Sequence, residues 1–302
     1  MSEIQSNAPP WINTAIQGKI DWRDQDIVIS VPAKSGTTWT MNIVYQLLNS
    51  GDPDFERVYS EVPWIEFLSR PGQGEQEILD LVASMPKDKA RAFKTHSAPP
   101  EIPYIETGSG KNVRYIVICR NPEEALTSFK PFMEKHTDAW YQLWDMPKAA
   151  MTRESFTDFY YEIIDKMGMQ GMFFGFLAAW WPYRHKSNVL FLHYADMKKD
   201  HETSLRKIAD FLAIYPDDKA WQDILTYTGF EWMKAHAEKF EPTVDGTVSV
   251  LESGAMIRKG QIGTAREDGM NEEISRHLYA AGKVICPDQD ALDWLYKGGE
   301  IK

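Results

Sequence analysis

The chain has 302 residues, of which 43% are hydrophobic and 25% are charged, and its formal net charge is -11. This acidic balance argues against general binding to nucleic acid or to an anionic membrane, because both partners call for a basic face. The hydrophobic content is ample for a sizeable core, and the length suits one large α/β domain.

The N-terminal region has no basic segment followed by an apolar one, as a signal peptide would have. The longest apolar run, residues 172–181, is far shorter than the roughly 20 residues of a membrane helix. The chain holds only two cysteines, Cys119 and Cys286, so a disulfide framework is not expected. These features predict a cytoplasmic location.

Four β-rich runs are continuous in apolar character, which is typical of buried parallel strands. Helical patterns lie between them, and the first of these ends at a cluster of turn residues. The predicted strands cover residues 27–31, 90–94, 113–119 and 189–193, and the first helix covers residues 37–49.

Alternating strands and helices predict the α/β class, with a P-loop-like central parallel sheet flanked by helices in a single domain over residues 1–302. Residues 138–176 are rich in aromatic side chains and are expected to form a helical insertion. Residues 240–269 have weak periodicity and several glycines, which favours a covering loop.

The first predicted strand runs directly into Pro32-Ala33-Lys34-Ser35-Gly36-Thr37-Thr38-Trp39. A turn at a helix N-terminus exposes unpaired backbone N–H groups, and a lysine and hydroxyl residues surround them here, so a phosphate or sulfate is the natural ligand. An ATP- or GTP-binding loop places its lysine after the second glycine of Gly-x-x-x-x-Gly-Lys. Lys34 precedes Gly36, which disfavours that loop.

The other predicted strands are also followed by polar side chains, namely His96, Arg120 and Tyr194. Because the carboxyl ends of parallel strands share one edge of the sheet, we expect these side chains to meet Lys34 there.

Arg120 begins a second phosphate motif. The next two residues, Asn and Pro, favour a helix start, and Ser128 lies about two turns along that helix. A guanidinium and a hydroxyl could hold one phosphate in this arrangement. The alternative for Arg120 is an ion pair with a nearby carboxylate.

These motifs resemble those of sulfotransferases that use the donor 3′-phosphoadenosine 5′-phosphosulfate (PAPS). Residues 32–39 resemble the family's 5′-phosphosulfate loop, and Arg120 with Ser128 resembles its 3′-phosphate motif. Arg258-Lys259-Gly260-Gln261-Ile262-Gly263 resembles its Arg-Lys-Gly-x-x-Gly loop, although a solvated surface loop is the alternative. The match is to the cytosolic small-molecule type, as a divergent, bacterial-like member.

The resemblance implies that the donor PAPS and the product adenosine 3′,5′-bisphosphate (PAP) bind without a metal. Tyr194 and the segment 228–230 match the family's adenine contacts. The implied donor ligands are Lys34, Ser35, Gly36, Thr37, Thr38, Trp39, Arg120, Ser128, Tyr194, Thr228, Phe230, Arg258, Lys259 and Gly260.

The resemblance also implies the catalytic groups. His96 matches the base of the family's Lys-x-His pattern, and histidine can accept a proton near neutral pH. Lys34 would stabilise charge on the oxygen that bridges sulfur and the 5′-phosphate, and Lys94 would hold sulfuryl oxygens. The other six histidines are expected to be structural or exposed.

The small-molecule acceptor stays open. The segment 62–67 resembles the family's acceptor-lining segment and contributes Trp64, Glu66 and Phe67. An apolar pocket would suit a phenol or alcohol, whereas Glu66 or Glu134 facing it would favour a cationic amine. Phe132, Trp140, Trp144, Phe173 and Phe174 could add aromatic walls, with Phe132 and Trp140 the candidates for acceptor binding, whereas most of these aromatics are expected to belong to the core.

Residues 264–270 depart from the family, which commonly continues Asp-Trp-Lys after the glycine-rich loop and later carries a dimer segment. The usual dimer contact is therefore in doubt, and the oligomeric state stays open. Two other functions are weighed: a P-loop kinase-like phosphotransferase and a nucleotide-binding module without catalysis.

Overall fold

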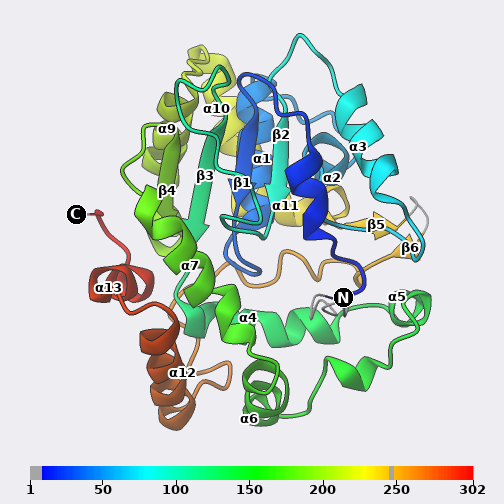
Figure 1. The fold of residues 1–302 in the computed structure, drawn as a ribbon, viewed down its shortest axis with the longest axis vertical. Coiled ribbons are helices and arrows are strands. Elements are labelled where there is room, and N and C mark those ends of the chain that lie inside the picture. The colour runs from blue at the N-terminus through cyan, green and yellow to red at the C-terminus, as the bar shows by residue number, and fades with distance from the viewer. Residues whose placement is uncertain (1–8, 245–247, 302) are drawn as a thin grey trace, which may run out of the picture.

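The computed structural model describes residues 9–244 and 248–301, so residues 245–247 of the expected covering loop lie outside the described part. Its centre is a parallel sheet of four strands in the order β2-β1-β3-β4 (Figure 1). The strands are β1 (Ile27–Ser30), β2 (Ala92–Thr95), β3 (Arg114–Cys119) and β4 (Val189–His193). Each begins and ends within about two residues of its predicted range.

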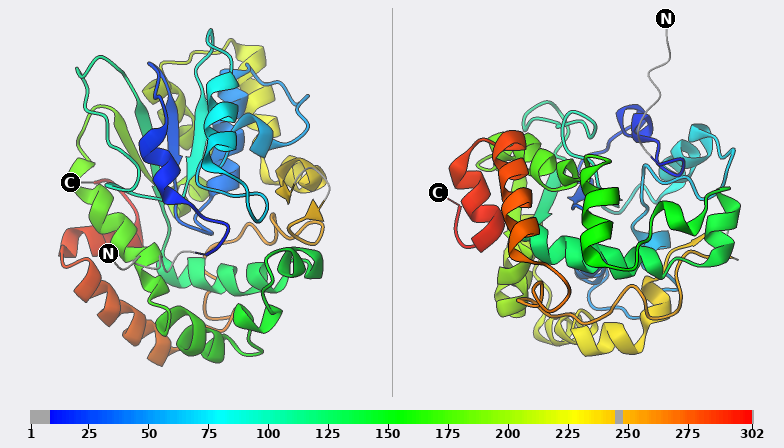
Figure 2. Two further views of the ribbon diagram at one scale, coloured as in Figure 1. Left: turned by 45° about the vertical axis from the view of Figure 1, so that its right-hand side comes forward. Right: turned by 90° about the horizontal axis from the view of Figure 1, so that it is seen from below.

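Helices cover both faces of this sheet (Figure 2). They are α1 (Thr37–Leu48), α2 (Val58–Glu61), α3 (Glu75–Ser84), α4 (Pro122–Glu134), α5 (Asp138–Leu143), α6 (Phe156–Phe159), α7 (Phe174–Trp180), α8 (Tyr194–Lys199), α9 (His201–Leu212), α10 (Asp218–Tyr227), α11 (Phe230–Ala235), α12 (Glu272–Ile285) and α13 (Gln289–Lys297). Shorter elements are η1 (Thr14–Lys19), η2 (Lys148–Ala150), the π-helical η3 (Tyr160–Asp165), η4 (Met169–Met172), η5 (Trp181–Tyr183), η6 (Ala237–Phe240) and the antiparallel pair β5 (Thr243–Val244) and β6 (Val248–Ser249).

The continuous apolar character of the strands follows from burial on both sides. Along β3, Tyr115 and Val117 face a core shared with α4, α7, α12 and α13, whereas Ile116 and Ile118 face a core shared with α1, α9 and α10. Because neither face meets water, no polar alternation is required. The predicted α/β fold with helices on both sides of a parallel sheet is confirmed.

The amino end of the sheet is joined by a buried ion pair. The Arg91 guanidinium donates to both Asp26 carboxylate oxygens, at 2.8 and 2.6 Å, and both side chains are at most 2% exposed. Such a bidentate pair fixes the start of β1 against the start of β2. Cys119 and Cys286 are buried and unpaired.

The carboxyl ends of the strands point toward α4 and the helices below it (Figure 1). The segment 138–176, expected to be helical, holds α5, η2, α6, η3, η4 and the start of α7 in this layer. The segment after β6 runs between the sheet and these helices. In the described part of the chain, no helix combines the length and apolar character that a membrane crossing needs.

Candidate active site

A pocket of about 580 Å³ lies at the carboxyl ends of the strands. As expected from the topology, the residues that follow the four strands, Lys34, His96, Arg120 and Tyr194, all line it. The other predicted site residues that line it are Gly36, Thr37, Thr38, Trp39, Trp64, Glu66, Phe67, Lys94, Ser128, Phe132, Trp140, Phe230, Arg258, Lys259 and Gly260.

Two predicted donor ligands, Ser35 and Thr228, do not line the pocket, and both are fully buried. The Ser35 N–H donates to the carbonyl of Pro32, so the backbone of Ser35 is occupied within the turn. Thr228 lies behind the pocket wall, where its carbonyl accepts from the Trp39 indole N–H at 2.9 Å. Thr228 therefore positions an aromatic wall and does not itself face the cavity.

The turn before α1 takes its shape from a close contact. Gly36 caps α1 with a φ of 99°, and a Cβ at this position would lie 2.8 Å from the Tyr194 ring, so only glycine fits. The Arg120 guanidinium donates to the Lys34 carbonyl at 2.9 Å and holds the other side of the turn. The first N–H groups of α1 have no partner within the helix, and they lie at its positive end beside the pocket.

The Lys34 ammonium lies 4.2 Å from the centroid of the Phe132 ring. Burial, with a further contribution from the charges of Arg120 and Arg258, lowers the pKa of Lys34 to about 7. Burial and the neighbouring cations therefore disfavour the charged form of Lys34, whereas a bound anion would favour it.

Arg120 lies in the pocket, as a phosphate ligand would, and also pairs with a carboxylate, which was the alternative that the sequence left open. Its guanidinium lines the pocket and lies 4.5 Å from the Tyr194 ring centroid. It also lies 3.3 Å from the Glu124 carboxylate, one turn along α4. Ser128 lies on the same helix and lines the same pocket, as a shared phosphate ligand would require.

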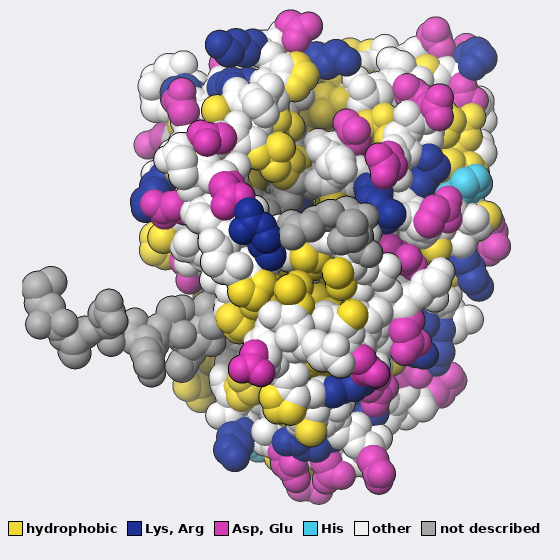
Figure 3. All heavy atoms as spheres, turned by 90° about the vertical axis from the view of Figure 1, so that its right-hand side faces the viewer, with side chains coloured by type: hydrophobic (Ala, Val, Ile, Leu, Met, Phe, Trp, Pro, Cys, Tyr) yellow, Lys and Arg dark blue, Asp and Glu magenta, His cyan; other side chains and the backbone are white. Residues whose placement is uncertain are grey.

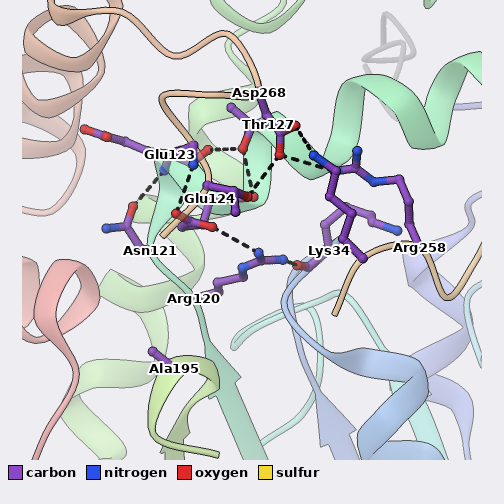
Figure 4. A network of polar contacts seen from close by, with 12 residues as sticks. Lys34, Arg120, Asn121, Glu123, Glu124, Thr127, Ala195, Arg258 and Asp268 are labelled. Atoms are coloured by element: carbon purple, nitrogen blue, oxygen red, sulfur yellow. Dashed lines mark hydrogen bonds and ion pairs between the residues drawn. The ribbon is translucent and has the colours of Figure 1, made fainter. Parts of the chain in front are cut away.

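The glycine-rich loop at Arg258 and Lys259 is not a detached surface loop, because both residues line the pocket. Gly260 has a φ of 60°, and a Cβ there would lie 2.3 Å from the Phe230 ring. This contact ties the loop to the aromatic wall. Figure 4 shows Arg258, Arg120 and Lys34 approaching from separate segments, with Arg258 pointing toward Asp268.

His96 is held by its backbone and by one ring nitrogen. Its N–H donates to the Glu66 carboxylate at 2.7 Å, and its Nδ1 contacts the Val31 carbonyl. Because a carbonyl only accepts hydrogen bonds, Nδ1 carries the proton and Nε2 keeps its lone pair. Burial and the charge of Lys94 lower the pKa of His96 well below its usual value, so the ring is neutral at neutral pH.

Lys94 is only 2% exposed, and its ammonium lies 3.0 Å from the centroid of the Trp64 ring. Burial lowers its pKa well below the ordinary lysine value, although the nearby Glu66 carboxyl opposes this shift. The His96 ring centroid lies 4.9 Å from that of the same Trp64 ring, so Lys94 and His96 lie close together in the pocket. The charge of Lys94 contributes to the lowered pKa of His96.

The rest of the pocket is apolar. Trp64 stacks on Phe67 with ring centroids 4.7 Å apart, and Trp11, which the sequence did not single out, lies 4.6 Å from Trp140. Figure 3 shows hydrophobic side chains gathering around a hollow on the side of the molecule where β5, β6 and α5 lie. The methionines that line the pocket are Met133, Met151, Met169, Met172, Met233 and Met256.

Three aromatic side chains weighed for the acceptor wall, Trp144, Phe173 and Phe174, are buried and do not line the pocket. They belong to the core packed against α4 and α7. The aromatic content of residues 138–176 does not by itself show which side chains face the pocket and which face the core. Glu134 also stays outside, where it pairs with Lys130.

Two histidines that were expected to be structural or exposed also line the pocket. The His136 ring lies 4.4 Å from Trp140 and is 5% exposed, and burial lowers the pKa of His136 to about 4. The His201 ring lies 5.4 Å from Trp39. Neither residue follows a strand, so the strand-edge argument could not find them.

A lysine was also missed. The Lys198 ammonium lies 5.3 Å from the Phe230 ring centroid and 5.5 Å from that of Trp39. Lys198 follows Tyr194 by one turn of α8, and this i,i+4 spacing would have identified it.

Comparison with known proteins agrees with this geometry, since the family model for the sulfotransferase domain matches residues 24–282. The chain belongs to the sulfotransferase family. Mouse Sulfotransferase 1E1 is 26% identical over 84% of this chain and 82% of its own length. The predicted enzyme class, a PAPS-dependent sulfotransferase, is confirmed.

Solved sulfotransferase-like structures share the fold. Mouse SULT7A1, solved in complex with PAP, has a TM-score of 0.68 and 23% identity, and covers 94% of this chain and 92% of its own. Retinol dehydratase, solved with retinol and PAP, has a TM-score of 0.69 and 22% identity, and covers 92% of this chain and 85% of its own.

Within residues 9–244 and 248–301, no three His, Cys, Asp or Glu side chains gather closely enough to hold a metal ion. The cations that line the pocket in this part of the chain come from five segments and are Lys34, Lys94, Arg120, Lys198, Arg258 and Lys259. Four carboxylates from the same residues, Glu66, Glu101, Glu124 and Asp268, line it as well.

The depressed pKa of Lys34 predicts proton uptake when PAP binds. At pH 8 the free protein has lost most of the Lys34 charge, because its pKa is about 7. A bound phosphate favours the ammonium form and raises that pKa, so up to about one proton is taken up and affinity falls as pH rises above 7. Calorimetric titration with PAP at pH 8, in two buffers of different ionisation enthalpy, measures this uptake.

Lys34→Met should remove most of the uptake. The matched control, Lys186→Met, removes an exposed lysine that pairs with Glu106, and should leave uptake unchanged. Equal uptake in the wild type and in Lys34→Met would contradict the assignment of the titration to Lys34.

Proposed function

We propose that PAPS lies across the pocket, with its 5′-phosphosulfate at the N-terminus of α1 and its 3′-phosphate between Arg120, Ser128 and Arg258. The observation that carries this proposal is that two groups of anion-binding residues and several aromatic rings line one pocket. Trp39 and Phe230 are the rings that would hold adenine. PAP in the solved structure of mouse SULT7A1 supports a bisphosphate ligand for this fold.

In the proposed reaction, His96 Nε2 takes the proton of the acceptor hydroxyl. The acceptor oxygen then forms a bond to sulfur, while the bond between sulfur and the oxygen bridging to the 5′-phosphate breaks, and its electron pair stays on the phosphate of PAP. A positioned base contributes about 100- to 10,000-fold to such a step. The free lone pair on Nε2 and the neutral state of the ring support this role.

Two lysines supply positive charge where the reaction needs it. We assign to Lys34 the charge that develops on the bridging oxygen, because it belongs to the turn that would hold the 5′-phosphate. Lys94 would contact sulfuryl oxygens, since its charge acts on His96 and it lines the same cavity. The expectation that no metal takes part stays a prediction.

The proposed acceptor is an apolar phenol or alcohol. Methionines and aromatic rings form most of the wall beyond His96. Glu66, weighed as a partner for an amine, accepts from the N–H of His96 and from the Thr95 hydroxyl, and burial raises its pKa toward the neutral form. Glu101 is exposed where it lines the pocket, and it is the carboxylate that a cationic acceptor would meet.

We further propose that the whole chain acts as one catalytic domain in a reducing cytoplasm, which the two buried, unpaired cysteines support. The P-loop kinase alternative is disfavoured by the order of Lys34 and Gly36 and by the family match. A substitution of His96 distinguishes the enzyme from a nucleotide-binding module without catalysis, because only the enzyme needs a base.

His96→Asn should lower sulfuryl transfer at least about 100-fold. Asparagine can still donate to the Val31 carbonyl but offers no base, so PAP affinity should change less than about twofold. Turnover with PAPS and titration with PAP measure the two effects. His185→Asn, at an exposed position, is the control. Turnover of His96→Asn within threefold of wild type would remove His96 from the mechanism.

A neutral acceptor should be preferred over a cationic one of the same size. We expect kcat/KM for 4-propylphenol to exceed that for tyramine at least about tenfold, because the wall is apolar and the ammonium would lose its hydration without a buried partner. Steady-state assays with both phenols measure the ratio. A preference for tyramine would show instead that a pocket carboxylate selects the acceptor.

A further inference from the structure

Asp268 already binds the cations of the glycine-rich loop. Its Oδ1 accepts from the Lys259 ammonium at 2.5 Å, and its Oδ2 lies 3.6 Å from the Arg258 guanidinium. Oδ2 also accepts from the Thr264 hydroxyl at 3.0 Å. Figure 4 shows Asp268 and Arg258 pointing toward one another. One internal carboxylate thus occupies the anion position that these two cations create.

This carboxylate is firmly placed. The Asp268 N–H donates to the Thr264 carbonyl at 3.0 Å, and the next residue, Gly269, has a φ of 108° and packs so closely that a Cβ would lie 2.6 Å from Phe156. Met270 is 2% exposed. The backbone on both sides of Asp268 is therefore held by the helical layer.

The loop is also tied to the other phosphate ligand. The Ala265 N–H donates to one Glu124 oxygen at 3.2 Å, and the other oxygen lies 3.3 Å from Arg120. The side chains of Arg258 and Lys259 are more than a third exposed, whereas that of Asp268 is 14% exposed. The cations are thus freer to change partner than the carboxylate is to move.

A phosphate that binds Arg258 and Lys259 must therefore face Asp268. Burial alone would raise the pKa of Asp268, but the hydrogen bonds from Lys259 and Thr264 and the charge of Arg258 hold it below its usual value. The group is ionised at neutral pH, and like charges brought together in a partly buried site repel one another strongly.

We propose that Asp268 is an internal substitute for the 3′-phosphate, which binds Arg258 and Lys259 when the nucleotide is absent and weakens the binding of PAPS and PAP. This inference rests on the proposed function, because it takes those two cations as 3′-phosphate ligands. As PAP leaves, Asp268 regains its ion pairs, so the carboxylate speeds product release. Release limits turnover in many enzymes.

The proposal predicts a gain of affinity on substitution. Asp268→Asn keeps the size and the acceptor for Thr264 but loses the charge, so it should bind PAP about tenfold more tightly than wild type and release it more slowly. Affinity for adenosine 5′-monophosphate, which lacks the 3′-phosphate, should stay within about twofold. Calorimetric titration and stopped-flow dissociation measure these quantities.

Two further variants complete the experiment. Asp268→Ser removes the carboxylate in a different way and should shift PAP affinity in the same direction. Asp293→Asn removes the partner of Lys297 on α13, away from the pocket, and should change neither nucleotide's affinity.

PAP affinity that is unchanged or weaker in both Asp268 variants would overturn the proposal, because Asp268 would then only position the two cations. Equal affinity of the wild type for PAP and adenosine 5′-monophosphate would instead refute the 3′-phosphate site itself, and the inference with it.

Discussion

The crowding of positive charge at the carboxyl edge of the sheet is the constraint on which the rest of this molecule depends. Lys34, Arg120 and Arg258 come from distant parts of an acidic chain, and burial, together with the charges of the two arginines, lowers the pKa of Lys34 to about 7. Like charges do not gather in a partly buried cavity without an opposing cause. A bisphosphate ligand that bridges them is the cause we propose, and solved structures of this fold hold PAP.

Close contacts between backbone and side chains, and not extended side-chain hydrogen-bond networks, hold the segments that carry these charges. Gly36 lets the turn before α1 lie directly against the Tyr194 ring, and Arg120 donates to the carbonyl of Lys34. Gly260 brings the distant glycine-rich loop equally close to Phe230. Each of these contacts joins two segments that follow different elements, so the pocket exists only when the parallel sheet has aligned them.

His96 depends on the same alignment. Its ring nitrogen contacts the end of the first strand at Val31, while its backbone is held by Glu66 from the loop that carries the acceptor wall. The proposed base is thus placed by one strand and one loop of the pocket.

The sequence predicted the sheet and its edge well, because continuous apolar runs and the residues directly after them are local signals. Lys34, His96 and Arg120 were found in this way. His136 and Asp268 were not, because each reaches the pocket from a helix end or an irregular loop whose position depends on tertiary packing. The sequence left open whether Phe173 lines the pocket or belongs to the core, where it lies, since composition cannot separate the two sides of a helical layer.

A crystal structure of the complex with PAP tests the central claim most directly. We expect the 5′-phosphate on the N–H groups at the start of α1 beside Lys34, and the 3′-phosphate on Arg120, Ser128 and Arg258, with the ribose between the two phosphate sites and adenine against Trp39 and Phe230. A nucleotide bound in the opposite direction, or with its 3′-phosphate in solvent, would contradict the claim that the crowded cations are one bisphosphate site.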